Sequence, residues 1–110
     1  MSKLADEHCQ EYPKGTPPLS EEEAEALAAE LPGWQREGTA RLRREYSFPN
    51  FRDAFGFVAR AALLAEREWH HPEIELGWGR CAFELTTHTV GGLSRNDFIM
   101  ATKLDGLASG

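Results

Sequence analysis

Hydrophobic positions along the chain switch between helical spacing and strand spacing, and these switches divide the sequence into elements. In the first regular stretch, apolar residues recur every three or four positions until Pro32 and Gly33 interrupt them. Just before it, Ser20 and Glu23 have the spacing of a capping box, in which two side chains satisfy the first backbone N–H groups of a helix. The pattern predicts a first helix over residues 21–31.

A spacing of two replaces the helical spacing between Trp34 and Phe48. The dipeptide Glu37-Gly38 within this region is a turn signal. We therefore predict a β-hairpin, in which Arg44 is the one residue that breaks the alternation.

The strongest helical pattern follows Asn50, which can cap it. Pro72 disfavours the α conformation at His71, so this helix is expected to end around His70 and to leave two imidazoles at its exit. Its predicted buried stripe comprises Ala54, Phe55, Val58, Ala61, Ala62, Ala65 and Trp69.

Residues 73–88 alternate again and predict a second hairpin with a glycine-flanked turn. Ser94 and Asp97 then repeat the capping-box spacing before a helical stripe that runs to the C-terminus. The order is α-β-β-α-β-β-α. It predicts an α+β fold, with one four-stranded antiparallel sheet and three helices packed on one face.

The length of 110 residues suits one domain. Residues 1–19 are polar and interrupted by proline and glycine, so we expect an extended or flexible N-terminal tail before a single domain over residues 20–110. The sequence has neither an apolar run long enough to span a membrane nor a secretory signal at its start. These features predict a cytoplasmic protein that does not bind membranes.

The net charge of −6 disfavours binding to the phosphates of a nucleic acid. Cys9 and Cys81 form neither a CxxC pair nor a disulfide framework, and Cys81 is interpreted as a small core residue.

Histidines are the main candidates for chemistry. His70 and His71 precede Pro72, His88 ends the last predicted strand, and the unperturbed pKa of histidine is near neutral. Glu66 lies four positions before His70, so on a helix its carboxylate would share a face with that imidazole. Asp97, in the first turn of the last helix, could approach the same region. These groups suggest proton transfer in a pocket between the layers.

Structural roles compete with this hypothesis. A single histidine often stabilises a helix end or lies in solvent, and Asp97 could act only in the cap with Ser94. Ser94 lacks the surroundings of a nucleophile, and Cys81 is expected on an apolar strand face. Imidazole and carboxylate together could bind zinc or iron, but the HxxxH, HExxH and HxH spacings are absent. Three tryptophans could stack on a planar ligand, although aromatic residues in such patterns more often belong to the core: Trp34, Trp69 and Trp78.

The residues around these histidines resemble the pterin-4a-carbinolamine dehydratase family. The resemblance covers essentially the whole chain and is most specific over residues 65–104. Its bacterial branch is matched in particular by residues 7–9 and 95–101. The motifs that carry it are EREWHHPE at 66–73, Trp78-Gly79, Thr87-His88, Gly92-Leu93-Ser94 and Asp97.

This resemblance implies an enzyme that eliminates water from 4a-hydroxytetrahydrobiopterin and gives quinonoid dihydropterin, in the recycling that supports aromatic amino-acid hydroxylases. It implies a homodimer or homotetramer and neither a metal nor an organic cofactor. Carried over by position, His70, His71 and His88 are the catalytic histidines. Supporting or substrate-binding roles are assigned to Glu66, Asp97, Pro72 and Trp78.

We expect His70 and His88 to form the acid/base pair and His71 mainly to hold the pterin. Trp69 and Asn96 stand where some relatives have an acidic and a basic residue, which leaves the local polarity of the pocket open. Two other functions are considered: a regulatory module, because animal relatives also act as dimerisation cofactors of a homeodomain transcription factor, and a metal-dependent hydrolase. The sequence leaves open the physiological pterin, the hydroxylase and the division of acid and base roles.

Overall fold

The computed structural model describes residues 4–109 and confirms the predicted α+β fold and element order. Two single-turn 3₁₀ helices, η1 (Leu4–Asp6) and η2 (His88–Val90), accompany the main elements. These are α1 (Glu21–Ala28), β1 (Gln35–Glu37), β2 (Arg41–Ser47), α2 (Phe51–Glu68), β3 (Glu73–Gly77), β4 (Arg80–Leu85) and α3 (Arg95–Ser109).

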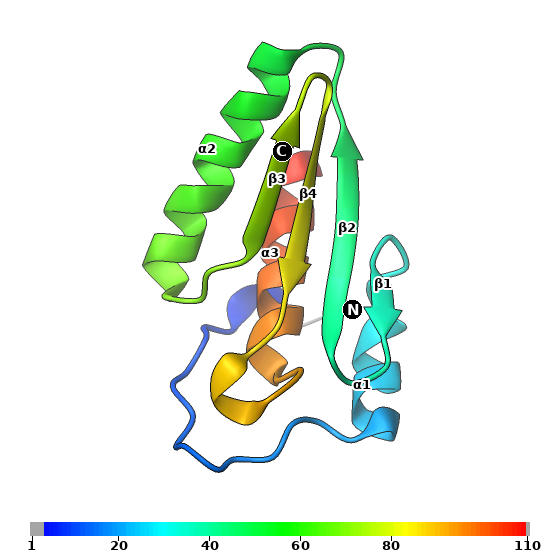
Figure 1. Cartoon of the computed structure of the whole chain (residues 1–110), viewed down its shortest axis with the longest axis vertical. Helices are drawn as coiled ribbons and strands as arrows, with labels where there is room; N and C mark the ends of the chain where they lie inside the picture. Colours follow the sequence, from blue (N-terminus) through cyan, green and yellow to red (C-terminus); the bar gives the residue numbers. More distant parts are fainter. Residues whose placement is uncertain (1–3, 110) are drawn as a thin grey trace.

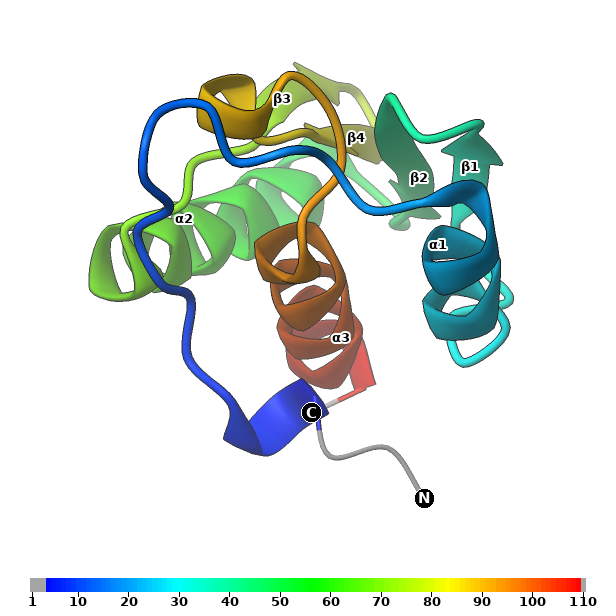
Figure 2. The same ribbon diagram turned by 90° about the horizontal axis from the view of Figure 1, so that it is seen from below.

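The two hairpins join through their longer strands into one antiparallel sheet of order β1-β2-β4-β3 (Figure 1). At the central seam, Leu42 lies opposite Leu85 and Tyr46 lies opposite Cys81. All three main helices lie on one side of this sheet (Figure 2). The other side carries ion pairs such as Arg43 with Glu75, which suits a sheet face in water.

The inward face of the sheet packs against α2 and α3 around an aromatic cluster. Phe57 of α2 lies 5.0 Å from the Tyr46 ring and 5.8 Å from the Phe83 ring, between ring centroids. The predicted stripe of α2 is therefore partly wrong, because Phe57 and Leu64 are buried whereas Phe55 and Ala62 are exposed. Apolar residues occupy both faces of α2, so the pattern alone could not select the buried one.

Arg44, which interrupts the alternation of its strand, has a specific partner on α3. The carboxylate of Asp105 accepts hydrogen bonds from Arg44, from the Trp34 indole and from the Tyr46 hydroxyl. Burial, together with the hydrogen bond to Asp105, raises the pKa of Tyr46 above its usual range. This polar cluster ties the first hairpin to the C-terminal helix.

The predicted tail lies against the domain over its described part; its first three residues fall outside the described residues. Leu4 is buried in the core in η1, where the sequence predicted no regular structure. Farther along, the Leu19 N–H donates to the Leu93 carbonyl. Among residues 4–109, the structure has no helix with the length and hydropathy required to cross a bilayer.

Candidate active site

The C-terminal end of α2 directs the two adjacent histidines, His70 and His71, to different surroundings. The helix ends at Glu68, two residues earlier than expected, because Trp69 adopts the left-handed conformation with φ of 54°. The N–H groups of Trp69 and His70 both donate to the Ala65 carbonyl and close the helix. A non-glycine residue in this conformation costs about 1–2 kcal/mol. As a result, His70 turns toward α3 while His71 remains near the surface.

His70 is held by a fully buried carboxylate. Its Nε2 lies 2.6 Å from Oδ1 of Asp97, which has no exposed surface. A carboxylate accepts hydrogen bonds, so this contact places the imidazole proton on Nε2. The neutral ring then has its free lone pair on Nδ1, the arrangement that a proton acceptor needs.

Asp97 is itself positioned by a chain of hydrogen bonds. The Thr87 hydroxyl and the Ser94 N–H both donate to its Oδ2, at 2.8 and 3.0 Å. Because the Thr87 proton points to Asp97, the Ser94 hydroxyl donates to Thr87, and the Asn96 N–H in turn donates to Ser94. Each buried polar group in this hydrogen-bond network has a partner, so the position of the Asp97 carboxylate is fixed. Asp97 therefore acts in the predicted cap and also holds His70.

The expected pairing of Glu66 with His70 is wrong. Glu66 Oε2 instead lies 2.5 Å from Nε2 of His71. The spacing of four brings side chains together only while the helix continues, and α2 ends before either histidine. This pair is exposed, so its contribution to stability is small.

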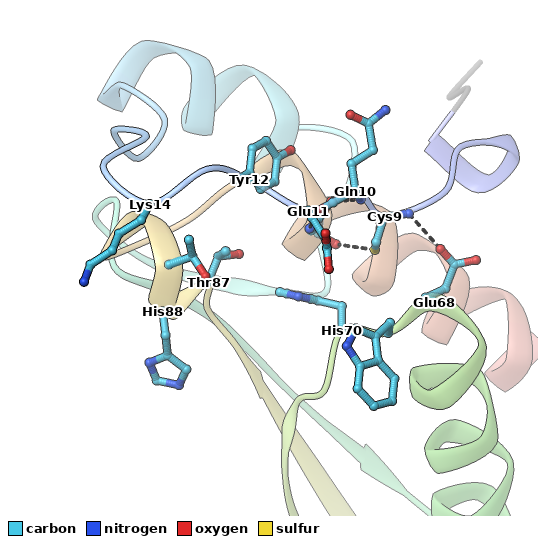
Figure 3. A pocket seen from close by; sticks show the side chains of 12 residues that line it. Cys9, Gln10, Glu11, Tyr12, Lys14, Glu68, His70, Thr87 and His88 are labelled. Carbon is cyan, nitrogen blue, oxygen red and sulfur yellow. Dashed lines mark hydrogen bonds between the residues drawn. The ribbon is translucent and has the colours of Figure 1, made fainter.

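A cavity of about 840 Å³ has both His70 and His88 in its lining. In Figure 3, the His70 imidazole enters the cavity from the α2–β3 connection, beneath the tail residues, whereas the exposed His88 lies on η2 at the rim with its ring turned away from the tail. The cavity is lined by Cys9, Gln10, Glu11, Tyr12, Lys14, Glu68, Trp69, His70, Thr87, His88, Thr89 and Asn96. His71, Glu66 and Pro72 are outside this lining, although they adjoin it in the chain.

The N-terminal tail supplies one wall of this cavity. Its backbone at Gln10 is paired with the buried Asn96 side chain: the Gln10 N–H donates to Oδ1, and Nδ2 donates to the Gln10 carbonyl. The Cys9 N–H donates to the buried Glu68 carboxylate at 2.8 Å. Burial raises the pKa of the Cys9 thiol to about 12. The polar pattern of the tail gave no signal for this wall.

Glu68 connects the tail to two helices. Burial alone would raise the pKa of Glu68, but hydrogen bonds from Cys9 and His8 and the charge of Lys103 outweigh it and lower the pKa. A carboxyl group with a lowered folded-state pKa stabilises the fold above its unfolded pKa. That contribution disappears as the pH falls through the folded-state value.

Glu68→Gln should therefore loosen the tail. We expect the hydrogen-exchange protection factor of the Cys9 amide to fall about tenfold at pH 7, because a charged acceptor is replaced by a neutral one. In the unsubstituted protein, the same protection factor should fall as the pH is lowered below about 4.3. Glu22→Gln, on the exposed face of α1, is the matched control. Unchanged protection in Glu68→Gln would contradict this role.

Trp78 is another expected site residue that lies outside the cavity lining. It lies in the β3–β4 turn, at the end of the sheet opposite η2 (Figure 1), and is 74% exposed. Trp69, in contrast, lines the cavity. Within residues 4–109, no group of three or more His, Cys, Asp or Glu side chains is arranged to hold a metal ion.

The sequence and the fold were compared with those of known proteins. Residues 17–107 match the model of the family described as "Pterin 4 alpha carbinolamine dehydratase". A protein of Rubrobacter xylanophilus named "Putative pterin-4-alpha-carbinolamine dehydratase" is 47% identical, and the match covers 97% of this chain and 100% of the relative. A protein of the same name from Methylococcus capsulatus is 43% identical over 96% of this chain and 94% of the relative.

Solved structures have the same fold. The crystal structure of a transcriptional coactivator/pterin dehydratase from Brucella melitensis matches with a TM-score of 0.77 and 38% identity, over 83% of this chain and 98% of that one. A pterin dehydratase-like protein, described as a RuBisCO assembly factor in the alpha-carboxysome, has a TM-score of 0.61 and 22% identity, over 71% of this chain and 92% of that one. The second likeness concerns the fold alone. Sequence and structure together show that the chain belongs to the pterin-4-alpha-carbinolamine dehydratase family.

Proposed function

We propose that this protein eliminates water from 4a-hydroxytetrahydrobiopterin to give quinonoid dihydropterin, as part of tetrahydrobiopterin recycling for aromatic amino-acid hydroxylation. The observation that carries the proposal is that His70 and His88 line the same cavity, with the His70 imidazole held by buried Asp97. The cavity volume of about 840 Å³ is within the range of small-molecule sites.

The reaction needs one acid and one base. Breaking the C4a–O bond requires a proton on the departing hydroxyl, and forming the C4a=N5 double bond requires removal of the N5 proton. The hydrogen bond to Asp97 favours His70 as the base through Nδ1, and the imidazolium that forms would be stabilised by the buried carboxylate. His88 would then protonate the hydroxyl, which leaves as water. The two transfers balance, so the reaction needs no further reactant.

A stopped-flow assay on freshly generated 4a-hydroxytetrahydrobiopterin tests this function. We expect the intact protein to accelerate dehydration well above the uncatalysed rate. His88→Ala should lose about 100-fold of kcat, because one of the two proton-transfer groups is missing. Dehydration by the intact protein at the uncatalysed rate would overturn the function. Near-normal kcat in His88→Ala would refute only the role of His88.

The proposal extends to a cytoplasmic homodimer or homotetramer. Self-association is supported by the edge position of β3 in the sheet and by the exposed apolar side chains of Phe51, Phe55 and Leu63 along α2. The predicted role of His71 in holding the pterin stays a prediction. A regulatory, protein-binding role is the second candidate, favoured by the same exposed side chains and by the coactivator description of the Brucella melitensis relative.

A further inference from the structure

We propose that the indole of Trp69 binds one face of the pterin ring system. This inference rests on the proposed dehydratase function and adds a substrate-binding residue to it. Neither the match to the family nor the histidine geometry requires an aromatic residue at this position.

The structure distinguishes among the three tryptophans that could stack on a planar ligand. Trp34 is buried in the core, with its indole N–H donated to Asp105. Trp78 lies in the β3–β4 turn, outside the cavity lining. Trp69 is the tryptophan that lines the cavity, directly before His70 in the chain. A ring stacked on its indole would lie beside the proposed base.

Two features of Trp69 work against stability. Its left-handed backbone, with φ of 54°, suits glycine or asparagine far better than a bulky side chain. Its side chain gains little from burial, since the residue is 69% exposed. Strained residues of this kind cluster at functional sites, where binding can offset the strain. The position of Trp69 at the cavity wall therefore favours a role in binding a ligand, which would offset the strain of its backbone.

The surroundings of Trp69 restrict how its ring can be used. The His71 ring lies against it edge-on, with 4.9 Å between centroids and 82° between planes. A hydrogen bond between the His71 imidazole and the Glu66 carboxylate in turn orients His71. These contacts limit the rotation of the indole and lower the entropy cost of binding. A pterin is a flat, nitrogen-containing bicycle, the kind of ring that stacks well on an aromatic face.

The test compares affinity with stability in Trp69→Asn. Asparagine tolerates the left-handed conformation, so Tm should rise by about 4 °C as the strain is relieved. At the same time, the Kd for 7,8-dihydrobiopterin, a stable probe, should rise about tenfold because the stacking face is lost. KM for dehydration should rise in parallel, while kcat changes less than about threefold. A purely structural tryptophan would not give a more stable protein that binds more weakly.

Two further variants make the test specific. Trp69→Phe retains an aromatic face and the strain, so its Kd should stay within about threefold and its Tm should not rise. Trp78→Phe removes an equally exposed indole outside the cavity, and the Kd should not change.

Three outcomes separate the inference from the function. If the intact protein catalyses dehydration but Trp69→Asn binds the probe as tightly as before, the stacking role is wrong and the function stands. If only Trp78→Phe weakens binding, the stacking face has been assigned to the wrong tryptophan. If the intact protein does not accelerate dehydration, the proposed function and this inference both fail.

Discussion

Alanine in place of His70 should reduce kcat for dehydration by about 100- to 10,000-fold, the range expected when a positioned proton acceptor is removed. His70 is the imidazole whose Nε2 is fixed by a buried carboxylate, which leaves Nδ1 for the proton on N5. Stopped-flow absorbance, corrected for uncatalysed dehydration, measures the loss.

The His70→Ala variant should remain folded, since Thr87 and Ser94 still donate to the Asp97 carboxylate. Added imidazole should restore part of the lost rate by entering the vacated space, whereas an amine buffer too large for that space should not. A kcat within threefold of the unsubstituted protein would contradict the assignment of His70 as the base.

The second large effect is expected from substitution of Asp97. Asp97→Ala should mainly lower Tm, whereas Asp97→Asn should mainly lower kcat. Asp97→Ala leaves the Thr87 hydroxyl and the Ser94 N–H without their buried acceptor, at a cost of about 1–3 kcal/mol each. We therefore expect Tm to fall by about 10 °C or more, measured by thermal unfolding followed by circular dichroism. A Tm within 2 °C of the unsubstituted protein would contradict this account of the network.

Asp97→Asn should remain more stable but lose activity. Thr87 and Ser94 both donate to the same oxygen, so that position must keep an oxygen and the amide nitrogen must face His70. An N–H donor opposite Nε2 forces the imidazole proton onto Nδ1, and the lone pair needed for catalysis is lost. We expect kcat to fall about as far as in His70→Ala. Nitrogen-15 NMR of His70 should report the changed tautomer, and an unchanged tautomer would rule out this explanation.

The parts of the fold that the sequence predicted correctly are specified locally. The capping box of Ser20 and Glu23 forms as expected, as does the cap by Asn50, because each involves residues three positions apart. The order of strands and helices follows from hydrophobic spacing for the same reason. The exact end of α2 could not be predicted from the sequence. Pro72 restricts only the residue before it, whereas the left-handed conformation of Trp69 ends the helix at Glu68.

The site was predicted less completely, since it depends on contacts between distant residues. The sequence pointed to His70, His88 and Asp97; the structure joins His70 to Asp97 by a hydrogen bond and places His70 and His88 in the lining of one cavity. It paired Glu66 with the wrong histidine, because the i, i+4 rule does not apply beyond a helix end. Contacts of the tail with Asn96 join residues 86 positions apart, and no local pattern announces them.

The pairing of Gln10 with Asn96 also bears on how the pocket is assembled during synthesis. The tail is synthesised before α3, but its docking surface includes Asn96 at the start of α3, 86 positions later in the sequence. A nascent chain can therefore form the first hairpin and α2 well before it can enclose the cavity. The wall that the tail supplies to the cavity can therefore form only after α3 has been synthesised.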